Sequence, residues 1–168
     1  MTVKPIRTLG DPFLREQTKP VDRFDATLRR LADDMFETMY AAPGVGLAAN
    51  QVGLSLACFV YDDQEGHRGF VANPRVSDLR QEDARDEGCL SIPGPFYATP
   101  RALSARLRGQ GLGGEPLDIR AEGLLARIFQ HEADHLQGML YIDRLSDEGR
   151  RDVMRQLREL ELQRAQEA

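Results

Sequence analysis

Hydrophobic residues at helical spacing predict an amphipathic helix near the start of the chain. Four apolar side chains recur at intervals of three and four residues between positions 24 and 42: Leu28, Leu31, Met35 and Met39. Such spacing places them on one face of a helix, which would be buried against the rest of the protein. Pro43 and Gly44 follow directly and predict the end of this helix.

Alternating hydrophobic residues predict two antiparallel hairpins in the middle of the chain. The runs LACFVY (56–61) and GFVANP (69–74) are rich in strand-forming residues and flank a polar loop that contains a glycine. Two later segments alternate apolar and polar residues on either side of the glycine-rich GQGLGGE (109–115). Their apolar positions are Leu103, Ala105, Leu107, Leu117, Ile119 and Ala121.

Two further helices are predicted in the last third of the chain. Leu124, Ile128, His131 and His135 follow one another at intervals of four, three and four residues. Both histidines therefore continue an apolar stripe and should face inward. The last helix begins at Asp147, where apolar residues at helical spacing lie among alternating charges. That pattern is typical of a helix on the protein surface.

Length, charge and cysteine content narrow the classes of function. A chain of 168 residues is sized for one domain, and its net charge of -5 argues against a general binder of nucleic acid or anionic membranes. No apolar run approaches the roughly 18 residues needed to span a bilayer, and no leader pattern opens the sequence. Cys58 and Cys89 are the only cysteines, which favours a reducing compartment. We therefore expect a cytoplasmic protein with a small or peptide-like substrate.

The sequence HEADH (131–135) carries the clearest chemical pattern. Histidines at positions i and i+4 project from one face of a helix and can share a metal ion, while Glu132 at i+1 can reach a water on that metal. The alternative is a chance pair of histidines, or a pair that is satisfied in the core. Because His131 and His135 extend an apolar stripe, the metal site is favoured.

A catalytic metal site needs a third protein ligand and an open position for water. Cys89 is the stronger candidate, because Gly88 allows close backbone approach and a short extended segment follows in DEGCLSIP. The alternative for Cys89 is a buried structural thiol. His67 lies in a polar loop, where a histidine is usually solvated, and Cys58 lies among apolar residues of a predicted strand and is assigned to the core.

Three motifs together carry a family resemblance. GVGLAANQ (44–51), EGCLS (87–91) and QHEADHL (130–136), in this order, closely resemble the three motifs of the peptide deformylases, and the resemblance covers nearly the whole chain. It implies hydrolysis of the N-formyl group from the N-terminal methionine of newly synthesised proteins, with release of formate. Combined with the predicted elements, it gives an expected fold over residues 1–168. This is a single α+β domain in which antiparallel strands pack around a central HExxH helix, with an N-terminal helix and a C-terminal surface helix.

The resemblance also implies roles for individual residues. Three residues fall on the family's metal ligands: Cys89, His131 and His135. The usual metal is ferrous iron, with zinc or nickel as possible substitutes. Glu132 falls on the general acid/base, and the Gln51 side chain and the Leu90 backbone N–H fall on the donors that stabilise the formyl oxygen. Four residues are expected to contact substrate: Val45, Gly46, Gly88 and Arg127.

Several arginines depart from the common pattern of the family. Arg127 and Arg85 stand where many bacterial members have apolar residues that line the methionine pocket. The simpler interpretation is that each packs its aliphatic stem and sends its guanidinium to water. The alternative is contact with the substrate backbone or with an acidic substrate side chain. Many members also place an arginine near Phe96, and we hypothesise that Arg101 pairs with Glu87 and holds the cysteine loop in place.

Two other functions would use part of the same pattern. A zinc peptidase would explain the histidine pair and its glutamate but would leave Cys89 and Gln51 without a role. A copper electron-transfer protein would add Met139 to the two histidines and a cysteine, but it has no use for a base beside an open coordination position.

In some family members a basic C-terminal helix docks on the ribosome. From Asp147 onward this chain has five arginines against six acidic residues. Attraction to phosphate would therefore be small, so we expect at most a weak ribosome contact and no direct binding of nucleic acid.

Overall fold

A computed structural model describes all 168 residues and contains three α-helices and one antiparallel sheet of five strands in the order β1-β2-β3-β4-β5. The helices are α1 (Ala26–Ala41), α2 (Gly123–Leu136) and α3 (Asp147–Glu167). The strands are β1 (Gly46–Ala48), β2 (Cys58–Asp62), β3 (Arg68–Cys89), β4 (Ile92–Gln110) and β5 (Pro116–Glu122). Short 3-10 helices cover Pro12–Arg15, Ala49–Val52 and Tyr141–Arg144. The predicted α+β class is confirmed.

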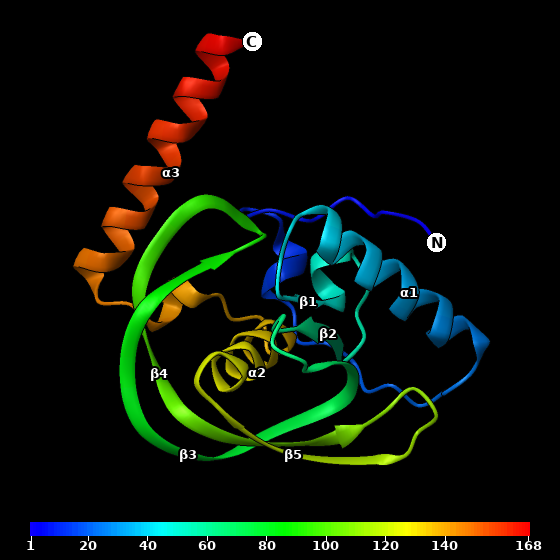
Figure 1. Cartoon of the computed structure of the whole chain (residues 1–168). Coiled ribbons are helices and arrows are strands. Elements are labelled where there is room, and N and C mark those ends of the chain that lie inside the picture. The colour runs from blue at the N-terminus through cyan, green and yellow to red at the C-terminus, as the bar shows by residue number, and fades with distance from the viewer.

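The sheet curves around α2, which lies at the centre of the molecule (Figure 1). Successive side chains of a strand point to opposite faces, and β2 uses both faces for packing. Cys58 and Val60 belong to the apolar cluster that includes α1, whereas Phe59 and Tyr61 belong to the cluster that includes α2. The continuous hydrophobic run of β2 is thus explained by a strand that is covered on both faces.

The predicted N-terminal helix is confirmed. The four apolar residues at helical spacing are all buried, and the Asp25 side chain caps the helix by accepting hydrogen bonds from the backbone N–H groups of Thr27 and Leu28. The stripe predicted for α2 is correct for Ile128 and both histidines but wrong for Leu124, which is 42% exposed. Leu124 stands in the first turn of α2, and its neighbour Leu125 is buried in its place.

Strands β3 and β4 are much longer than the sequence predicts. Both hairpins form as expected, but β3 continues from Pro74 to Cys89 through the polar run RVSDLRQEDARDEG, which has no hydrophobic alternation. Its pairing with β4 shifts register at three places, and Asp78 and Gln81 adopt positive φ. This long ribbon sweeps around α2 (Figure 1), and its return brings Cys89 at the end of β3 into contact with His135 of α2.

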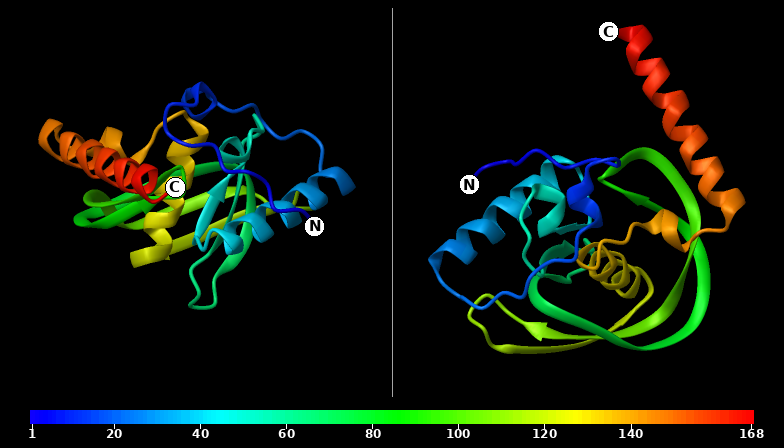
Figure 2. Two further views of the ribbon diagram at one scale, coloured as in Figure 1. Left: turned by 90° about the horizontal axis from the view of Figure 1, so that it is seen from above. Right: turned by 180° about the vertical axis from the view of Figure 1, so that it is seen from behind.

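The C-terminal helix α3 is a surface helix, as predicted. Ser146 caps the helix by accepting a hydrogen bond from the backbone N–H of Gly149. The helix buries two of its own apolar side chains, Val153 and Leu157. Its last turns project away from the body of the protein (Figure 2). None of the helices combines the length and the hydropathy required to cross a membrane.

Candidate active site

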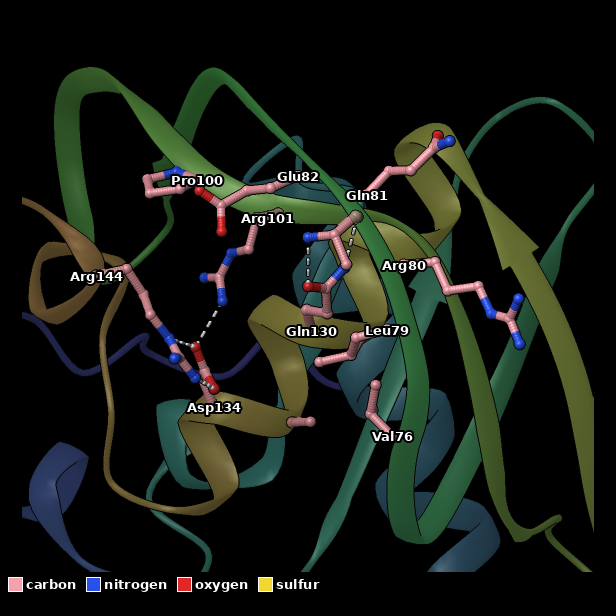
Figure 3. A pocket seen from close by; sticks show the side chains of 12 residues that line it. Val76, Leu79, Arg80, Gln81, Glu82, Pro100, Arg101, Gln130, Asp134 and Arg144 are labelled. Carbon is pink, nitrogen blue, oxygen red and sulfur yellow. Dashed lines mark hydrogen bonds and ion pairs between the residues drawn. The ribbon is translucent and has the colours of Figure 1, made fainter.

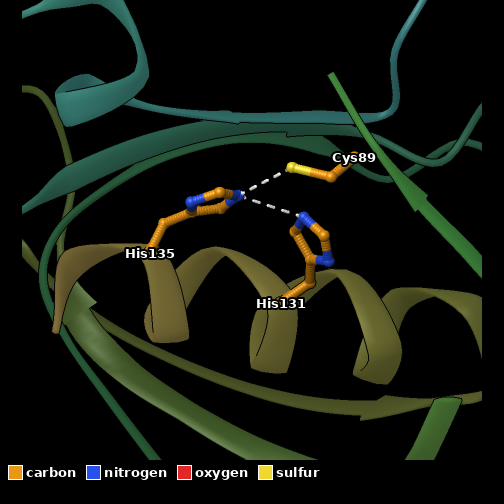
Figure 4. A group of neighbouring side chains, drawn as sticks. All are labelled: Cys89, His131 and His135. Carbon is orange, nitrogen blue, oxygen red and sulfur yellow. Dashed lines mark hydrogen bonds between the residues drawn. The ribbon is translucent and has the colours of Figure 1, made fainter. Parts of the chain in front are cut away.

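Two elements far apart in sequence bring three candidate metal ligands together. Helix α2 supplies His131 and His135, and the end of β3 supplies Cys89 (Figure 4). His135 Nε2 lies 3.3 Å from Cys89 Sγ and 3.1 Å from His131 Nε2. All three candidate ligand atoms lie within 4.8 Å of one another. His67, the weaker candidate for the third metal ligand, is instead an exposed side chain paired with Asp63.

The cluster fits a divalent transition metal. An ion with tetrahedral bonds of about 2.0–2.3 Å separates its ligand atoms by about 3.3–3.8 Å, close to the separations seen here. One thiolate and two imidazoles suit zinc or iron better than magnesium or calcium. A buried oxygen of the neighbouring carboxylate, Glu132 Oε2, has no hydrogen-bond partner. Such an atom is suited to accept a hydrogen bond from a water at the metal.

Glu87 orients His131 by contacting the ring nitrogen that faces away from the cluster. The Nδ1 atom of His131 lies 2.7 Å from Glu87 Oε2, and because a carboxylate only accepts, the imidazole N–H donates. This leaves Nε2 of His131 with its lone pair toward the cluster. Burial opposes ionisation of Glu87, but hydrogen bonds from His131 and Arg101 outweigh it and hold the pKa of this carboxyl below its usual range.

Arg101 links Glu87 to a second buried carboxylate. Its Nε and Nη2 donate to the two oxygens of Glu87 at 3.1 and 2.8 Å, which confirms the predicted pair. Its Nη1 donates to Asp134 at 2.6 Å, and Arg144 donates to Asp134 from the other side (Figure 3). These ion pairs border a separate surface cavity of about 500 Å³ on the side of Gln130 and Asp134. The network thus runs from this cavity to a candidate metal ligand.

Replacing Arg101 by methionine is expected to destabilise the fold. Arg101 is only 4% exposed, and breaking a buried ion pair typically costs about 3–5 kcal/mol. We expect a loss of about 3 kcal/mol in the free energy of unfolding, because Arg127 and Arg144 still neutralise the two carboxylates. Urea unfolding would measure it beside Arg85→Met, which removes a single exposed ion pair worth about 0–1 kcal/mol. Equal midpoints for the two variants would contradict the assignment.

Glu132 is buried beside the first motif. Burial raises the pKa of Glu132 to about 7. Its Oε1 lies so close to Gly46 that a Cβ built on that glycine would be 2.4 Å from the oxygen. The glycine of GVGLAANQ therefore makes room for the glutamate of α2. Sequence reasoning had connected this glycine only with a substrate backbone.

Gln51 is held by hydrogen bonds at both ends of its amide. Its Oε1 accepts from the backbone N–H of Ala48 at 2.9 Å, and its Nε2 donates to Ser91 Oγ at 3.0 Å. The same Nε2 is 3.8 Å from Cys89 Sγ. These contacts place the amide next to the candidate metal ligands. Leu90 follows Cys89 at the turn between β3 and β4 and packs against the apolar cluster of α1.

Two of the candidate ligands, Cys89 and His131, line a large cavity of about 600 Å³. Its walls come from the first motif, the cysteine loop and α2. They include all four residues that were predicted to contact substrate: Val45, Gly46, Gly88 and Arg127. Three exposed apolar side chains also line it: Val45, Phe96 and Leu124.

Comparison with known proteins gives the family. The family model described as polypeptide deformylase matches residues 3–151. The chain belongs to the polypeptide deformylase family. The peptide deformylase of Acidothermus cellulolyticus is 50% identical over 161 residues, covering 96% of this chain and 89% of the relative. The peptide deformylase of Brucella suis is 41% identical and covers 98% and 97%.

Solved structures of the deformylase family show the same fold. The crystal structure of a peptide deformylase from Legionella pneumophila has a TM-score of 0.92 and 39% identity, and the similarity covers 98% of each chain. The peptide deformylase of Thermus thermophilus has a TM-score of 0.88 and 40% identity, covering 99% of this chain and all of that one.

Within this deformylase fold, the structure tests the expectations for three single residues. The guanidinium of Arg127 was expected in water, but it is buried and donates to Glu87 and to two backbone carbonyls, so that expectation is wrong. Arg85 is exposed, in keeping with the simpler interpretation. Cys58 is fully buried, and burial raises the pKa of its thiol to about 12, which confirms its place in the core.

Sequence reasoning missed two polar residues that support the site of this deformylase-family chain. Asp134 lies inside HEADH, but the sequence offers no sign that it binds two arginines. Ser91 lies inside EGCLS, and its contact with Gln51 joins two motifs that are 40 residues apart. Asp134 and Arg101 are 33 residues apart and Gln51 and Ser91 are 40 apart, so no local pattern in the sequence indicates either contact.

Proposed function

We propose that this chain removes the N-formyl group from the N-terminal methionine of newly synthesised proteins and releases formate. One observation carries the proposal: Cys89, His131 and His135 converge beside a buried glutamate at the wall of a cavity. A metal-dependent hydrolase needs such an arrangement, because metal, base and substrate must meet at one place. Membership of the deformylase family supports the same reaction.

We propose that the three clustered residues hold one divalent metal ion, ferrous iron in the cell, with zinc or nickel as substitutes. When bound, such an ion lowers the pKa of a coordinated water toward about 7 and polarises a carbonyl oxygen. The donor set supports this proposal, since a thiolate and two imidazoles leave a fourth position for water or substrate.

Glu132 is the proposed proton carrier. Its buried, unpartnered Oε2 would accept the proton of the attacking water as the formyl carbon is attacked. The amine cannot leave as an anion, so the same carboxyl group would then donate that proton to the departing nitrogen. A carboxylate whose pKa lies near 7 can act in both directions at neutral pH.

The Gln51 amide and the Leu90 backbone N–H are the proposed donors to the formyl oxygen as negative charge develops there. The contacts with Ala48 and Ser91 support this role for Gln51, because they hold its amide in one orientation before substrate arrives. Preorganised donors of this kind are typically worth about 10²–10³-fold in kcat. Val45, Gly46, Gly88 and Arg127 are proposed to contact the bound peptide from the walls of the cavity.

Gly46→Ala should lower kcat by about 100-fold without loss of metal. The new Cβ would lie 2.4 Å from Glu132 Oε1, and a displacement of about 1 Å at a catalytic group can cost about 100-fold. Gly44→Ala is the matched control, since its Cβ would meet the flexible end of Leu90. A Gly46→Ala protein as active as the Gly44→Ala protein would contradict the role given to this contact.

The proposed function is tested by formate release from formyl-Met-Ala-Ser. The protein is purified without oxygen, and the unformylated Met-Ala-Ser is assayed beside it for peptide-bond cleavage. We expect formate from the first peptide and no cleavage of either. Cleavage of the unformylated peptide without formate release would favour the zinc peptidase instead, and an intense blue colour with copper would favour the electron-transfer protein.

The place of action follows from the proposed substrate. Formylated nascent chains emerge from ribosomes, so we propose that this protein acts in the cytoplasm and makes at most a weak contact with the ribosome. The balanced charges of α3 support only a weak contact, since the chain has five arginines and six acidic residues from Asp147 onward.

A further inference from the structure

A small cavity adjoins the wall of the large cavity beside the candidate metal site. It has a volume of about 110 Å³ and is lined by Arg85, Asp86, Ala102, Leu103, Gly123, Leu124 and Arg127. Three of these residues also line the large cavity: Asp86, Leu124 and Arg127. Asp86 and Leu124 are exposed, whereas Arg127 is only 9% exposed. Arg127 is therefore the buried part of the partition between the two cavities.

The partition stands between the candidate metal site and the small cavity. His131, which lines only the large cavity, lies one helical turn after Arg127, and Gly123, which lines only the small one, lies one turn before it. A rise of about 1.5 Å per residue places each of them about 6 Å from Arg127 along α2. A substrate side chain that runs from the metal site along α2 toward its first turn would therefore meet Arg127.

Three hydrogen bonds hold the guanidinium of Arg127 in place. Its Nη1 donates to the Thr99 carbonyl at 2.8 Å and to Glu87 Oε1 at 3.0 Å, and its Nη2 donates to the Asp83 carbonyl at 3.1 Å. Thr99 belongs to β4, and Asp83 and Glu87 belong to β3. The side chain thus ties α2 to both strands of the ribbon. Because these bonds fix its conformation, Arg127 cannot swing aside without losing them.

We propose that Arg127 is a specificity-determining residue that limits the length of the first substrate side chain by closing the large cavity toward the small one. This inference rests on the proposed function, because it assumes that the large cavity receives the formylated residue. A longer unbranched side chain would meet the fixed guanidinium. Removing the side chain beyond Cβ would join the two cavities and admit the longer chain.

The test compares two substrates on each enzyme form. Wild type and Arg127→Ala are assayed with formyl-Met-Ala-Ser and with formyl-2-aminooctanoyl-Ala-Ser, whose first side chain is a six-carbon chain. We expect the ratio of kcat/KM values to shift by about tenfold or more toward the longer substrate in Arg127→Ala, since burying two further methylenes is worth about that factor. A general loss of activity from the altered contact with Glu87 cancels in this ratio.

Two controls separate a steric partition from other effects. Arg85→Ala changes a residue that lines only the small cavity, so its ratio should stay at the wild-type value. Arg127→Met removes the hydrogen bonds but keeps an unbranched side chain across the gap, and its ratio should shift much less than that of Arg127→Ala. If Arg127→Ala does not fold, Arg127→Gln shortens the side chain with an amide retained and should shift the ratio in the same direction.

The outcomes also keep this inference apart from the proposed function. A ratio in the shortened variant within twofold of wild type, or an equal shift in Arg85→Ala or Arg127→Met, would overturn the partition. If wild type released no formate from formyl-Met-Ala-Ser, the proposed function itself would fail.

Discussion

Replacing Glu132 by alanine is expected to lower kcat for deformylation by about 10³–10⁴-fold while the protein keeps its metal. General acid–base groups typically contribute about 10²–10⁴-fold, and Glu132 is proposed to move a proton in both halves of the reaction, which favours the upper part of that range. Glu132 is not one of the three proposed metal ligands, so the affinity for the ion should change little. The expected result is therefore an inactive protein with metal bound.

Metal content and kcat must be measured on the same sample of Glu132→Ala. Glu122→Ala is the matched control, because Glu122 directly precedes α2, is exposed and makes no capping hydrogen bond to the helix. It should keep wild-type activity and metal. If Glu132→Ala retained more than a tenth of wild-type kcat with a full complement of metal, the proposed proton transfers would need another group.

Cys89→Ala is expected to weaken metal binding by more than about 100-fold, and activity should fall with metal content. Removing a residue that only supports a ligand typically costs about 10–100-fold in metal affinity, so removing a ligand should cost more. The two histidines would remain in place on α2 but would form an incomplete site. Titration with zinc or cobalt, followed by competition with a chelator, would measure the change in affinity.

Cys58→Ala provides the control for the loss of a thiol. Cys58 is fully buried in the apolar cluster of α1 and is not one of the three proposed metal ligands. Its replacement leaves a small cavity, which should lower thermal stability slightly but leave metal affinity unchanged. If Cys89→Ala bound metal as tightly as Cys58→Ala, the proposed ligand set would be wrong.

The sequence by itself determined the helices, the two hairpins and the histidine pair of the candidate metal site. Local spacing decides these features: Leu28 and Met39 share a helix face because of the helical repeat, and His131 and His135 share one for the same reason. The alternation at Leu107 and Ile119 likewise predicted a pair of strands that the structure shows side by side. Such patterns depend only on residues within a few turns or one strand of each other.

Only the tertiary structure decided how the residues around the site support one another. Nothing in the polar run before Cys89 indicated that β3 returns to α2, because an exposed ribbon needs no hydrophobic alternation. The burial of Arg127 could not be predicted either, since its partners Glu87 and Thr99 lie 40 and 28 residues away. An arginine is buried only where carboxylates and carbonyls from other elements meet its guanidinium, and that meeting is a property of the folded chain.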